Sequence, residues 1–542
     1  MRTTSFTLLL AGLALTVACS DDDQNLGAIA GSSGQSGSSA QGPGGAGGQA
    51  GTANPAGGAG TSSGGGSAGA AGGLAGNESV CVTDPACITQ TGGPSCRRGG
   101  SCVAMTSKDC TRVLGNASQG GQIVLGVMAP LTGSQQAVGT SHVKAIQTAL
   151  EGYRDVSDDT VLVVCDEVAD PTAAATHLTD DLGVPLVYGP FWGDAISKTR
   201  TVFKGRPTIN LLPVADDPSL PYLSDDDQVW SCKPGRAPIN VYWRNVIGKI
   251  EPYFASKSSP VRLTMLVAGD ASSQNLAAGV INETFFNQQS GDANLKEGNL
   301  VRFDYEDPHK VTPSYAAVTT KVTSGASLPD LIVILPGGGE VPSLIGAIES
   351  AWPTGSTYPR YLVVGSEFLE QTAGLSAAPG APPLASRLLA LDHVGADASL
   401  RASFVKEFQA LQMGVSPRPG DEYAYDCFWL GQYALLTATS LGSKPWSELT
   451  GTTFASAGIG RINPPGQVVG VGGADAKTAR GLLEASSDLD LQGVSSALDV
   501  DLGWHAPAPH GRLSCIKDGK LVASGVEFDP SSGGVSGTNG CP

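Results

Sequence analysis

The chain has 542 residues, more than the roughly 250 to 300 at which a single hydrophobic core stops growing, so at least two folded lobes are expected. Its formal net charge of -17 argues against a nucleic-acid-binding surface, which needs clustered Lys and Arg. The same charge leaves no basic patch for anionic lipid. A negative net charge of this size can keep a secreted protein soluble.

Residues 1–19 have the pattern of a bacterial lipoprotein signal peptide. Arg2 precedes an apolar run that ends at Cys19 and is too short for a permanent membrane span. The residues before Cys19 resemble the lipobox, with Thr16 where leucine is usual, and the resemblance implies an acylated Cys19. We therefore expect a lipid-anchored protein of the cell envelope, with ordinary secretion as the alternative. Ser20, directly after Cys19, favours the outer membrane.

Two segments precede the main body of the chain. Residues 20–80 are rich in glycine, alanine and serine, which predicts a disordered, flexible tether. Residues 81–120 hold five cysteines and few large apolar residues, which predicts a small cysteine-rich neck that depends on disulfide bonds. Because five is odd, one of these cysteines is expected to pair with the main body. Their spacing lacks the CxxC pairs of a zinc site.

The cysteine count suits an oxidising compartment. Of eleven cysteines, ten remain when Cys19 is set aside, and an even number in an exported chain predicts disulfide bonds. The sequence leaves their connectivity open. The candidates are Cys81, Cys87, Cys96, Cys102, Cys110, Cys165, Cys232, Cys427, Cys515 and Cys541.

From Ile123 onward, short β-branched runs alternate with amphipathic stretches, which is the pattern of βαβ units around a parallel sheet. The expected strands are 123–128, 161–165, 185–188, 208–211, 263–267, 331–335 and 361–364. The expected helices are 141–154, 172–182, 194–203, 272–288, 343–350 and 400–412. Ligands of such open sheets bind outside the carboxyl ends of the strands, so the strand-to-helix loops are the candidate site.

Several collinear blocks resemble the leucine/isoleucine/valine-binding family of type I periplasmic binding proteins. They include IVLGVMAPLTGSQQAVG, the D-x-x-x-D-P turn in VVCDEVADPT, the loop YGPFWGDAISKT and the helix EYAYDCFWLGQYALLTA. The resemblance spans residues 121–530 and implies an α/β fold of two doubly wound, Rossmann-like lobes joined by three crossovers, with a ligand cleft between them. By position, lobe one is 121–232 with 392–490, lobe two is 233–391 with 491–530, and 531–542 is a tail.

Only some of the family's ligand-binding positions hold the same residue type in this sequence. The family's lobe-two glutamate, which meets a ligand ammonium, matches Glu367. The family's serine and threonine positions fall on Gly193 and Asp216, beside Ala215, and its first-loop aromatic falls on Val138. These departures point away from a branched-chain amino acid.

The loop that contains Gly193 has its own chemistry. Phe191 and Trp192 precede Gly193 at the start of an expected helix, where backbone N–H groups favour an anion. Asp194 is expected mainly as the N-cap of that helix. If the acidic residues of these loops face the cleft beside the two aromatics, the site favours a cationic or zwitterionic ligand. Aromatic residues in the core and acids facing solvent are the alternative.

Two further groups of small residues follow expected strands. Gly337, Gly338 and Gly339 either let the backbone approach a ligand or permit a tight turn. Ser272 and Ser273 begin a helix, where capping is favoured over ligand binding. The full candidate set for ligand binding is Val138, Phe191, Trp192, Gly193, Asp194, Ala215, Asp216, Ser272, Gly337, Gly338 and Glu367.

Catalytic signatures are missing from the sequence: HExxH and GxxxxGK[ST] do not occur, and the two G-x-S-x-G strings, at 60–64 and 65–69, lie in the tether. We therefore expect a monomeric solute-binding protein, without enzyme activity, cofactor or metal, that captures an amino acid or a related amine or amide by hinge closure. The expected partners are the small ligand, an ABC permease and, through Cys19, the lipid bilayer, but not nucleic acid. A sensing module that acts through a partner protein and a purely structural protein are the alternatives.

Overall fold

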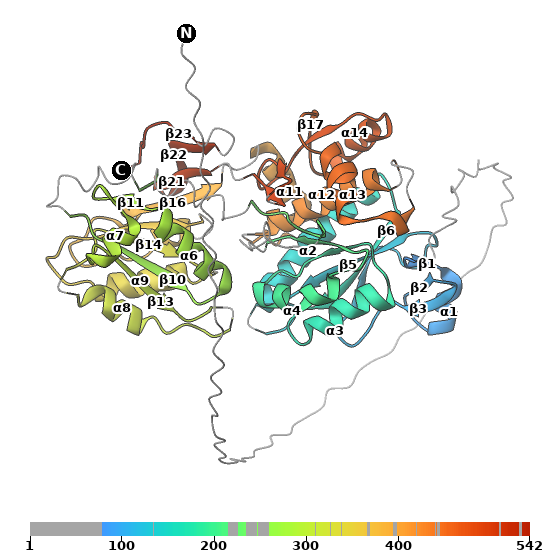
Figure 1. Ribbon diagram of the computed structural model, residues 1–542, viewed down its shortest axis with the longest axis horizontal. Coiled ribbons are helices and arrows are strands. Elements are labelled where there is room, and N and C mark those ends of the chain that lie inside the picture. Colours follow the sequence, from blue (N-terminus) through green and yellow to red (C-terminus); the bar gives the residue numbers. More distant parts are fainter. Residues whose placement is uncertain are drawn as a thin grey trace, which may run out of the picture. The chain divides into compact units, whose positions relative to one another are not determined.

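The computed structural model describes residues 79–133, 135–214, 226–234, 246–247, 260–308, 310–325, 327–337, 339–365, 369–393, 398–418, 420–439, 441, 445–503, 505–508, 511–529 and 534–541. The predicted signal peptide, with Cys19, and residues 20–78 of the predicted tether lie outside these residues. The last two residues assigned to the tether belong to the folded part: Val80 is buried, and the Ser79 carbonyl oxygen accepts a hydrogen bond from Arg98. Figure 1 shows the two large sheets that organise the described part of the chain.

The first sheet joins the cysteine-rich segment to the parallel strands that follow it. The cysteine-rich segment supplies β1 (Val82–Thr83), β2 (Ser95–Arg98), β3 (Ser101–Ala104) and β4 (Arg112–Leu114). The parallel strands are β5 (Ile123–Ala129), β6 (Thr160–Asp166), β7 (Leu186–Tyr188), β8 (Ile209–Leu212) and β9 (Val229–Ser231). The strand order is β3-β2-β1-β5-β7-β8-β9, and β6 pairs with both β5 and β4.

The helices that pack with the first sheet come from two stretches of the chain. The first stretch gives α1 (Pro85–Thr91), α2 (Gln136–Arg154), α3 (Pro171–Thr176), the π-helical turn η1 (His177–Asp181) and α4 (Gly193–Phe203). The second gives α11 (Ala398–Leu411), α12 (Asp421–Ala438), η5 (Trp446–Glu448), α13 (Gly451–Thr453), η6 (Phe454–Gly458), η7 (Ile459–Arg461) and α14 (Gly473–Glu484), with the parallel pair β17 (Gln467–Gly470) and β18 (Leu489–Gln492). The shared core extends to Val500.

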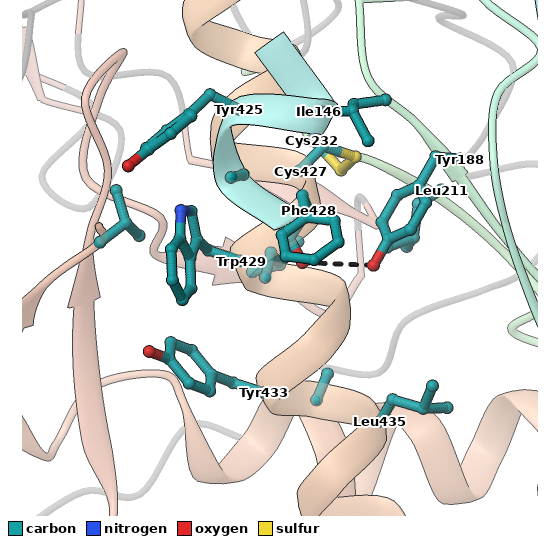
Figure 2. Packing of buried hydrophobic residues seen from close by; sticks show 14 of the residues in the cluster. Ile146, Tyr188, Leu211, Cys232, Tyr425, Cys427, Phe428, Trp429, Tyr433 and Leu435 are labelled. Atoms are coloured by element: carbon teal, nitrogen blue, oxygen red, sulfur yellow. Dashed lines mark hydrogen bonds between the residues drawn. A yellow bond between two sulfur atoms is a disulfide. The ribbon is translucent and has the colours of Figure 1, made fainter. Parts of the chain in front are cut away.

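Helix α12 lies at the centre of this core, because apolar and aromatic residues surround it on every side. Figure 2 shows Tyr425, Trp429 and Tyr433 along one side of the helix, and the Tyr188 hydroxyl donating to the Phe428 carbonyl oxygen at 3.2 Å. A disulfide bond between Cys427 of α12 and Cys232, just after β9, fixes the helix to the sheet.

The second sheet has the order β13-β10-β14-β15-β16-β21-β22-β23. Its parallel strands are β10 (Leu263–Ala268), β13 (Leu300–Tyr305), β14 (Leu331–Leu335), β15 (Arg360–Val364) and β16 (Leu388–His393), followed by the antiparallel β21 (Gly511–Lys517), β22 (Lys520–Asp529) and β23 (Gly534–Ser536). Its helical segments are α6 (Ala271–Glu283), α7 (Gly291–Lys296), α8 (Ala316–Thr323), α9 (Val341–Ala351), α10 (Leu369–Ala373) and η4 (Leu384–Arg387). The short pairs are β11 (Phe285–Phe286) with β12 (Gln289–Ser290) and β19 (Val500–Asp501) with β20 (Ala506–Pro507).

Apolar cores cover both faces of the second sheet. In β14, Leu331, Val333 and Leu335 pack on one face, and Ile332 and Ile334 pack on the other. Alternate side chains of a strand point to opposite faces, so a strand that is apolar throughout must be covered on both sides. The predicted α/β class with doubly wound sheets is thereby confirmed.

The observed elements differ from the expected ones at several places, of which two show why. The helix predicted at 272–288 ends at Glu283, because Phe285 and Phe286 turn into the short pair with β12. Strand β13 was not expected, since it lies at the edge of the sheet and is mostly half-buried, with charged side chains along it.

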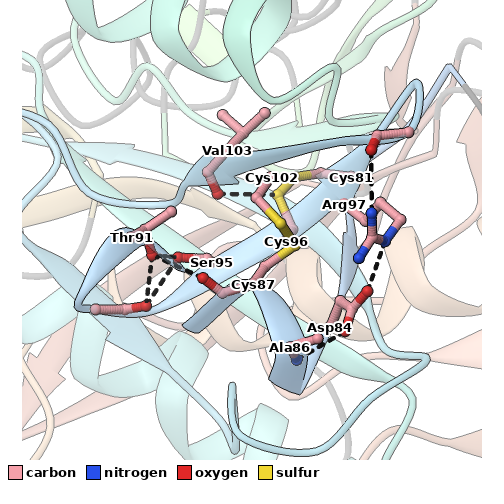
Figure 3. The surroundings of a disulfide bond; sticks show 12 residues. Cys81, Asp84, Ala86, Cys87, Thr91, Ser95, Cys96, Arg97, Cys102 and Val103 are labelled. Carbon is pink, nitrogen blue, oxygen red and sulfur yellow. Dashed lines mark hydrogen bonds and ion pairs between the residues drawn. A yellow bond between two sulfur atoms is a disulfide. The ribbon is translucent and has the colours of Figure 1, made fainter. Parts of the chain in front are cut away.

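Five disulfide bonds pair all ten cysteines from Cys81 to Cys541. The pairs are Cys81–Cys96, Cys87–Cys102, Cys110–Cys165, Cys232–Cys427 and Cys515–Cys541. The Cys110–Cys165 bond confirms the prediction that one cysteine of the neck pairs with the main body. Figure 3 shows the first two pairs beside the Arg97–Asp84 ion pair, in which Arg97 Nε lies 2.6 Å from Asp84 Oδ2.

The pairing predicts that the unfolded, unreduced protein has no reactive thiol among these ten cysteines. The bond between Cys110 and Cys165 closes a loop of 55 residues. A crosslink of that span stabilises the fold by about 4 kcal/mol, because it lowers the conformational entropy of the unfolded chain. Denaturant unfolding of the Cys110→Ala, Cys165→Ala double variant should show the loss of that stability. Two or more reactive thiols in the wild type, or an unchanged unfolding midpoint in the variant, would contradict the pairing.

Asp426 of α12 makes the stability of the first core depend on pH. The carboxyl is fully buried, and this burial raises its pKa to about 7, although the backbone N–H groups of Val494 and Ser495 and the Ser495 hydroxyl donate to it. The folded state therefore holds this proton more tightly than the unfolded state does. Its contribution to stability is full in acid and is lost as pH rises through about 7.

We expect the free energy of unfolding to fall by on the order of 3 kcal/mol between pH 4 and pH 8 through this group. Asp426→Asn should be less stable in acid and should show a flatter pH dependence. Glu448→Gln, which alters an exposed acid at the end of η5, should keep the wild-type slope. Denaturant titrations at several pH values measure all three proteins. Identical slopes for wild type and Asp426→Asn would show that the carboxyl does not titrate in this range.

Candidate functional site

The carboxyl ends of β5, β6 and β7 lie beside one another, because β5 pairs in parallel with both β6 and β7. Asp166 ends β6 and holds the loop after β5. Its Oδ1 accepts from the backbone N–H of Leu131 at 2.9 Å, and its Oδ2 accepts from the Thr132 hydroxyl at 2.5 Å. Asp166 was not among the predicted site residues, although the D-x-x-x-D-P turn marked its position.

Glu167, the next residue, holds the loop after β7. Its side chain is 3% exposed, and its Oε2 accepts from the backbone N–H of Phe191 at 2.8 Å. Burial raises the pKa of this carboxyl well above its usual range, against the lowering effect of backbone hydrogen bonds from Phe191 and Trp192. The carboxyl therefore joins two neighbouring loops at the edge of the sheet.

Gly189 is required where the loop after β7 begins. Its φ is +115°, and a Cβ at this position would collide with the carbonyl oxygen of Met128 in β5. The Asn210 side-chain amide donates to the Gly189 carbonyl oxygen, and the Gly189 N–H donates to Leu211 at 2.7 Å. Strands on both sides of β7 thus fix where the loop leaves the sheet.

The predicted residues of this loop separate in the structure. Phe191 is 0% exposed and stacks on the His142 ring with centroids 5.4 Å apart, so it belongs to the core, whereas Trp192 is half-buried and Gly193 is exposed. The expectation that Asp194 caps α4 is wrong. Trp192 has the extended backbone of the N-cap, which leaves Asp194 within the first turn of the helix.

Asp194 is 57% exposed, and its Oδ2 lies 3.2 Å from Nζ of Lys310, which also pairs with Asp307 at 3.3 Å. An ion pair that exposed contributes about 0 to 1 kcal/mol, so it sets local charge more than stability. Val138 lies half-buried in the first turn of α2.

The second sheet repeats this arrangement at the carboxyl ends of β10, β13 and β14, where β10 pairs with both of the others. Asp270 follows β10 and caps α6, because its Oδ1 accepts from the Ser273 N–H at 2.9 Å. The expectation that Ser272 or Ser273 caps this helix is therefore wrong. Ser273 is buried and donates to the Pro336 carbonyl oxygen at 3.2 Å, and Ser272 lies in α6, its side chain outside the described residues.

Glu340 holds the loop after β14. Its Oε1 accepts from the Tyr305 hydroxyl at 2.6 Å and from the Gly337 N–H at 2.8 Å. One interpretation of Gly337 was that its backbone could approach a ligand closely. Its N–H instead donates to Glu340 within the same loop. Gly339 is exposed. Sequence reasoning missed Glu340, and only its place two residues before Pro342, at the start of a helix, distinguished it.

Four of the predicted ligand-binding residues, Ala215, Asp216, Gly338 and Glu367, lie outside the described residues. Within the described ranges, no group of three or more His, Cys, Asp or Glu side chains is arranged to hold a metal ion. None of the helices in those ranges is long and apolar enough to cross a membrane.

No protein-family model matches the chain, and no curated protein matches it in sequence. Solved structures match its fold. A leucine-binding protein of Thermotoga maritima is 16% identical with a TM-score of 0.50, covering 76% of this chain and 99% of its own. A solute-binding protein of an ABC transporter from Rhodopseudomonas palustris, in complex with 3,4-dihydroxybenzoic acid, is 13% identical with a TM-score of 0.52, covering 78% and 99%. An extracellular ligand-binding receptor from another strain of that species is 15% identical with a TM-score of 0.50, covering 74% and 99%.

The chain therefore has the type I periplasmic binding protein fold, as its sequence blocks predicted. Sequence identities of 13 to 16% carry the fold alone. The nature of the ligand must be argued from the loops themselves.

Replacing Asp166 tests whether it orders the loop after β5. Asp166→Ala leaves the Leu131 N–H without its acceptor, and losing such a hydrogen bond costs about 1 to 3 kcal/mol. Hydrogen exchange should therefore find the Leu131 amide much less protected. Asp170→Ala, which removes only the cap of α3 from the same turn, should leave that amide protected. Equal protection in wild type and Asp166→Ala would mean that the loop is ordered by other contacts.

Proposed function

We propose that this protein is an extracytoplasmic solute-binding lipoprotein that captures a small polar solute and delivers it to an ABC transporter. The observation that carries the proposal is the same in both sheets: buried or half-buried carboxyl groups that follow the strands order the loops at the edge where parallel sheets bind ligands. The fold is shared with structures described as solute-binding proteins, which supports the proposal. We propose binding without catalysis, since the sequence has no catalytic signature.

The ligand is proposed to carry an amine or a related N–H donor group. The described loop ends bring carboxyl groups to both sheets, Asp166 and Glu167 to the first and Asp270 and Glu340 to the second. Glu367, which matches the ammonium-binding glutamate of the leucine-binding family, is proposed to add to this set. An aromatic acid, as bound by the Rhodopseudomonas palustris protein, is the competing ligand class.

Capture is proposed to work by hinge closure. A solute that contacts both lobes shifts the equilibrium toward the closed form only by its higher affinity for that form. Acylated Cys19 is proposed to hold the protein on the cell envelope, with residues 20–78 as the tether. The second candidate function is sensing through a partner protein, which the match to an extracellular ligand-binding receptor supports.

The test is a thermal-shift screen of the mature protein with amino acids, polyamines, small amides and aromatic acids, since a ligand that binds only the folded form raises the melting temperature. We expect an amine-bearing solute to do so and to reduce the radius of gyration in X-ray scattering. Glu367→Gln should weaken its binding by about 1.5 to 3 kcal/mol, the contribution of a hydrogen bond to a charged group.

Asp194→Asn is the matched control, because it removes the charge of an exposed pair and should change affinity by about 1 kcal/mol at most. No stabilisation by any member of the panel would contradict solute binding. Unchanged affinity in Glu367→Gln would remove this glutamate from the site while leaving solute binding intact.

A further inference from the structure

Helix α9 offers a comparison between two buried glutamates of one element. Glu349 is 1% exposed, and both of its oxygens are fully partnered: Oε1 by the Tyr361 hydroxyl and Arg387 Nη1, and Oε2 by the Ala378 N–H and Arg387 Nη2, all within 2.9 Å. Arg387 forms a buried ion pair with this carboxylate. It shows how the fold satisfies a buried negative charge when the charge has a structural role.

Glu340, at the N-terminal end of the same helix, is 6% exposed and is satisfied only on one side. Its Oε1 receives hydrogen bonds from Tyr305 and Gly337, while its Oε2 is buried and has no hydrogen-bond partner among the described residues. Asp270 repeats this condition. Its Oδ1 caps α6, and its Oδ2 is buried without a hydrogen-bond partner in the same part of the chain.

Gly337 brings these two carboxyl groups together. Its N–H donates to Glu340 Oε1, and a Cβ built on it would lie 2.7 Å from Asp270 Oδ2, so both acids border the same glycine. Both carboxyl groups also act electrostatically on the Tyr305 hydroxyl. Burial first, and then the charges of Glu340 and Asp270, raise the pKa of its hydroxyl well above the usual range. The two open oxygens therefore belong to one cluster at the carboxyl ends of β10 and β14.

The described basic residues of this edge are engaged elsewhere. Lys310 pairs with Asp194 and Asp307, and Arg302 pairs with Asp304. A buried carboxylate oxygen without a donor is costly, and it is satisfied by a cation that donates N–H bonds or by a proton. Two such oxygens in one cluster fit a group with several N–H donors.

We propose that Asp270 and Glu340 form a subsite for the ammonium or guanidinium group of the solute, which donates to Asp270 Oδ2 and Glu340 Oε2. Tyr305 acts as a positioning residue, because its hydroxyl holds the other oxygen of Glu340. The inference rests on the proposed function and deepens it by assigning the ligand a cationic end and two residues that receive it. These residues differ from Glu367, which the family resemblance indicated.

The experiment uses the mature full-length protein with two probes, putrescine for the ammonium group and agmatine for the guanidinium group. Calorimetry and thermal shift compare wild type with Glu340→Gln and Asp270→Asn. Both variants are expected to fold, since glutamine keeps an acceptor for Tyr305 and Gly337, and asparagine caps a helix about as well as aspartate. The matched control is Glu297→Gln, an exposed acid that precedes β13 at the opposite end of the strand.

We expect each variant to bind the preferred probe at least tenfold more weakly than wild type, with Glu297→Gln unchanged. Wild-type affinity in both variants would overturn the subsite. The subsite would also be overturned if the wild type bound benzoate or a neutral amide and neither amine. That result would leave solute capture standing and would change only the class of ligand. Stabilisation by calcium alone that is lost in Glu340→Gln would also overturn the subsite, since the cluster would then be a metal site. If no solute of the whole panel binds, the proposed function fails and the subsite with it.

Discussion

A carboxyl group at the end of a buried parallel strand needs hydrogen-bond donors from neighbouring loops. This requirement shapes the edge of each sheet where the candidate ligand loops lie. In the first sheet, Asp166 meets it with both oxygens and Glu167 with Oε2 alone, by accepting from the two neighbouring loops. In the second sheet, Asp270 and Glu340 meet it with one oxygen each. The loops are ordered because leaving these acids without donors would be costly.

The rest of the fold keeps those strand ends in place. The parallel strands of the second sheet are covered on both faces, and helix α12 fills the core beside the first sheet, so neither set of strand ends can shift without disturbing a packed interior. The disulfide bonds act at the same places. Cys165 lies next to Asp166 in β6 and is joined to Cys110, which ties the cysteine-rich segment to the strand that organises the first loop.

Much of the architecture could be predicted because its signals are local. The run Leu331–Leu335 coincides with β14, and the expected helix starts and ends are mostly within a few residues of those observed. The β21–β22 hairpin was missed despite a clear local signal, the Asp518-Gly519 turn, in which both residues have positive φ. Strand β13 was missed for a different reason, since its half-exposed edge position removes the apolar run on which strand prediction depends.

The candidate site was predicted less well, because a side chain's role there depends on neighbours that are distant in sequence. Glu340 gains its meaning from Tyr305, 35 residues earlier, and Glu167 from Phe191, 24 residues later. Asp194 was expected to be a cap because of its residue type, but the backbone of Trp192 decides where α4 begins. The edge of each sheet where loops follow the strands could be named from the sequence, whereas the acids that order those loops required the tertiary structure.

Asp270 Oδ2 and Glu340 Oε2 are buried without a hydrogen-bond partner among the described residues, and we propose that they receive the cationic end of a solute. The most direct measurement is a crystal structure of the protein grown with agmatine. The account predicts N–H donors of the bound molecule about 2.7 to 2.9 Å from Glu340 Oε2 and Asp270 Oδ2. Agmatine bound away from both oxygens, or a lysine or arginine of the chain itself paired with them, would contradict the account.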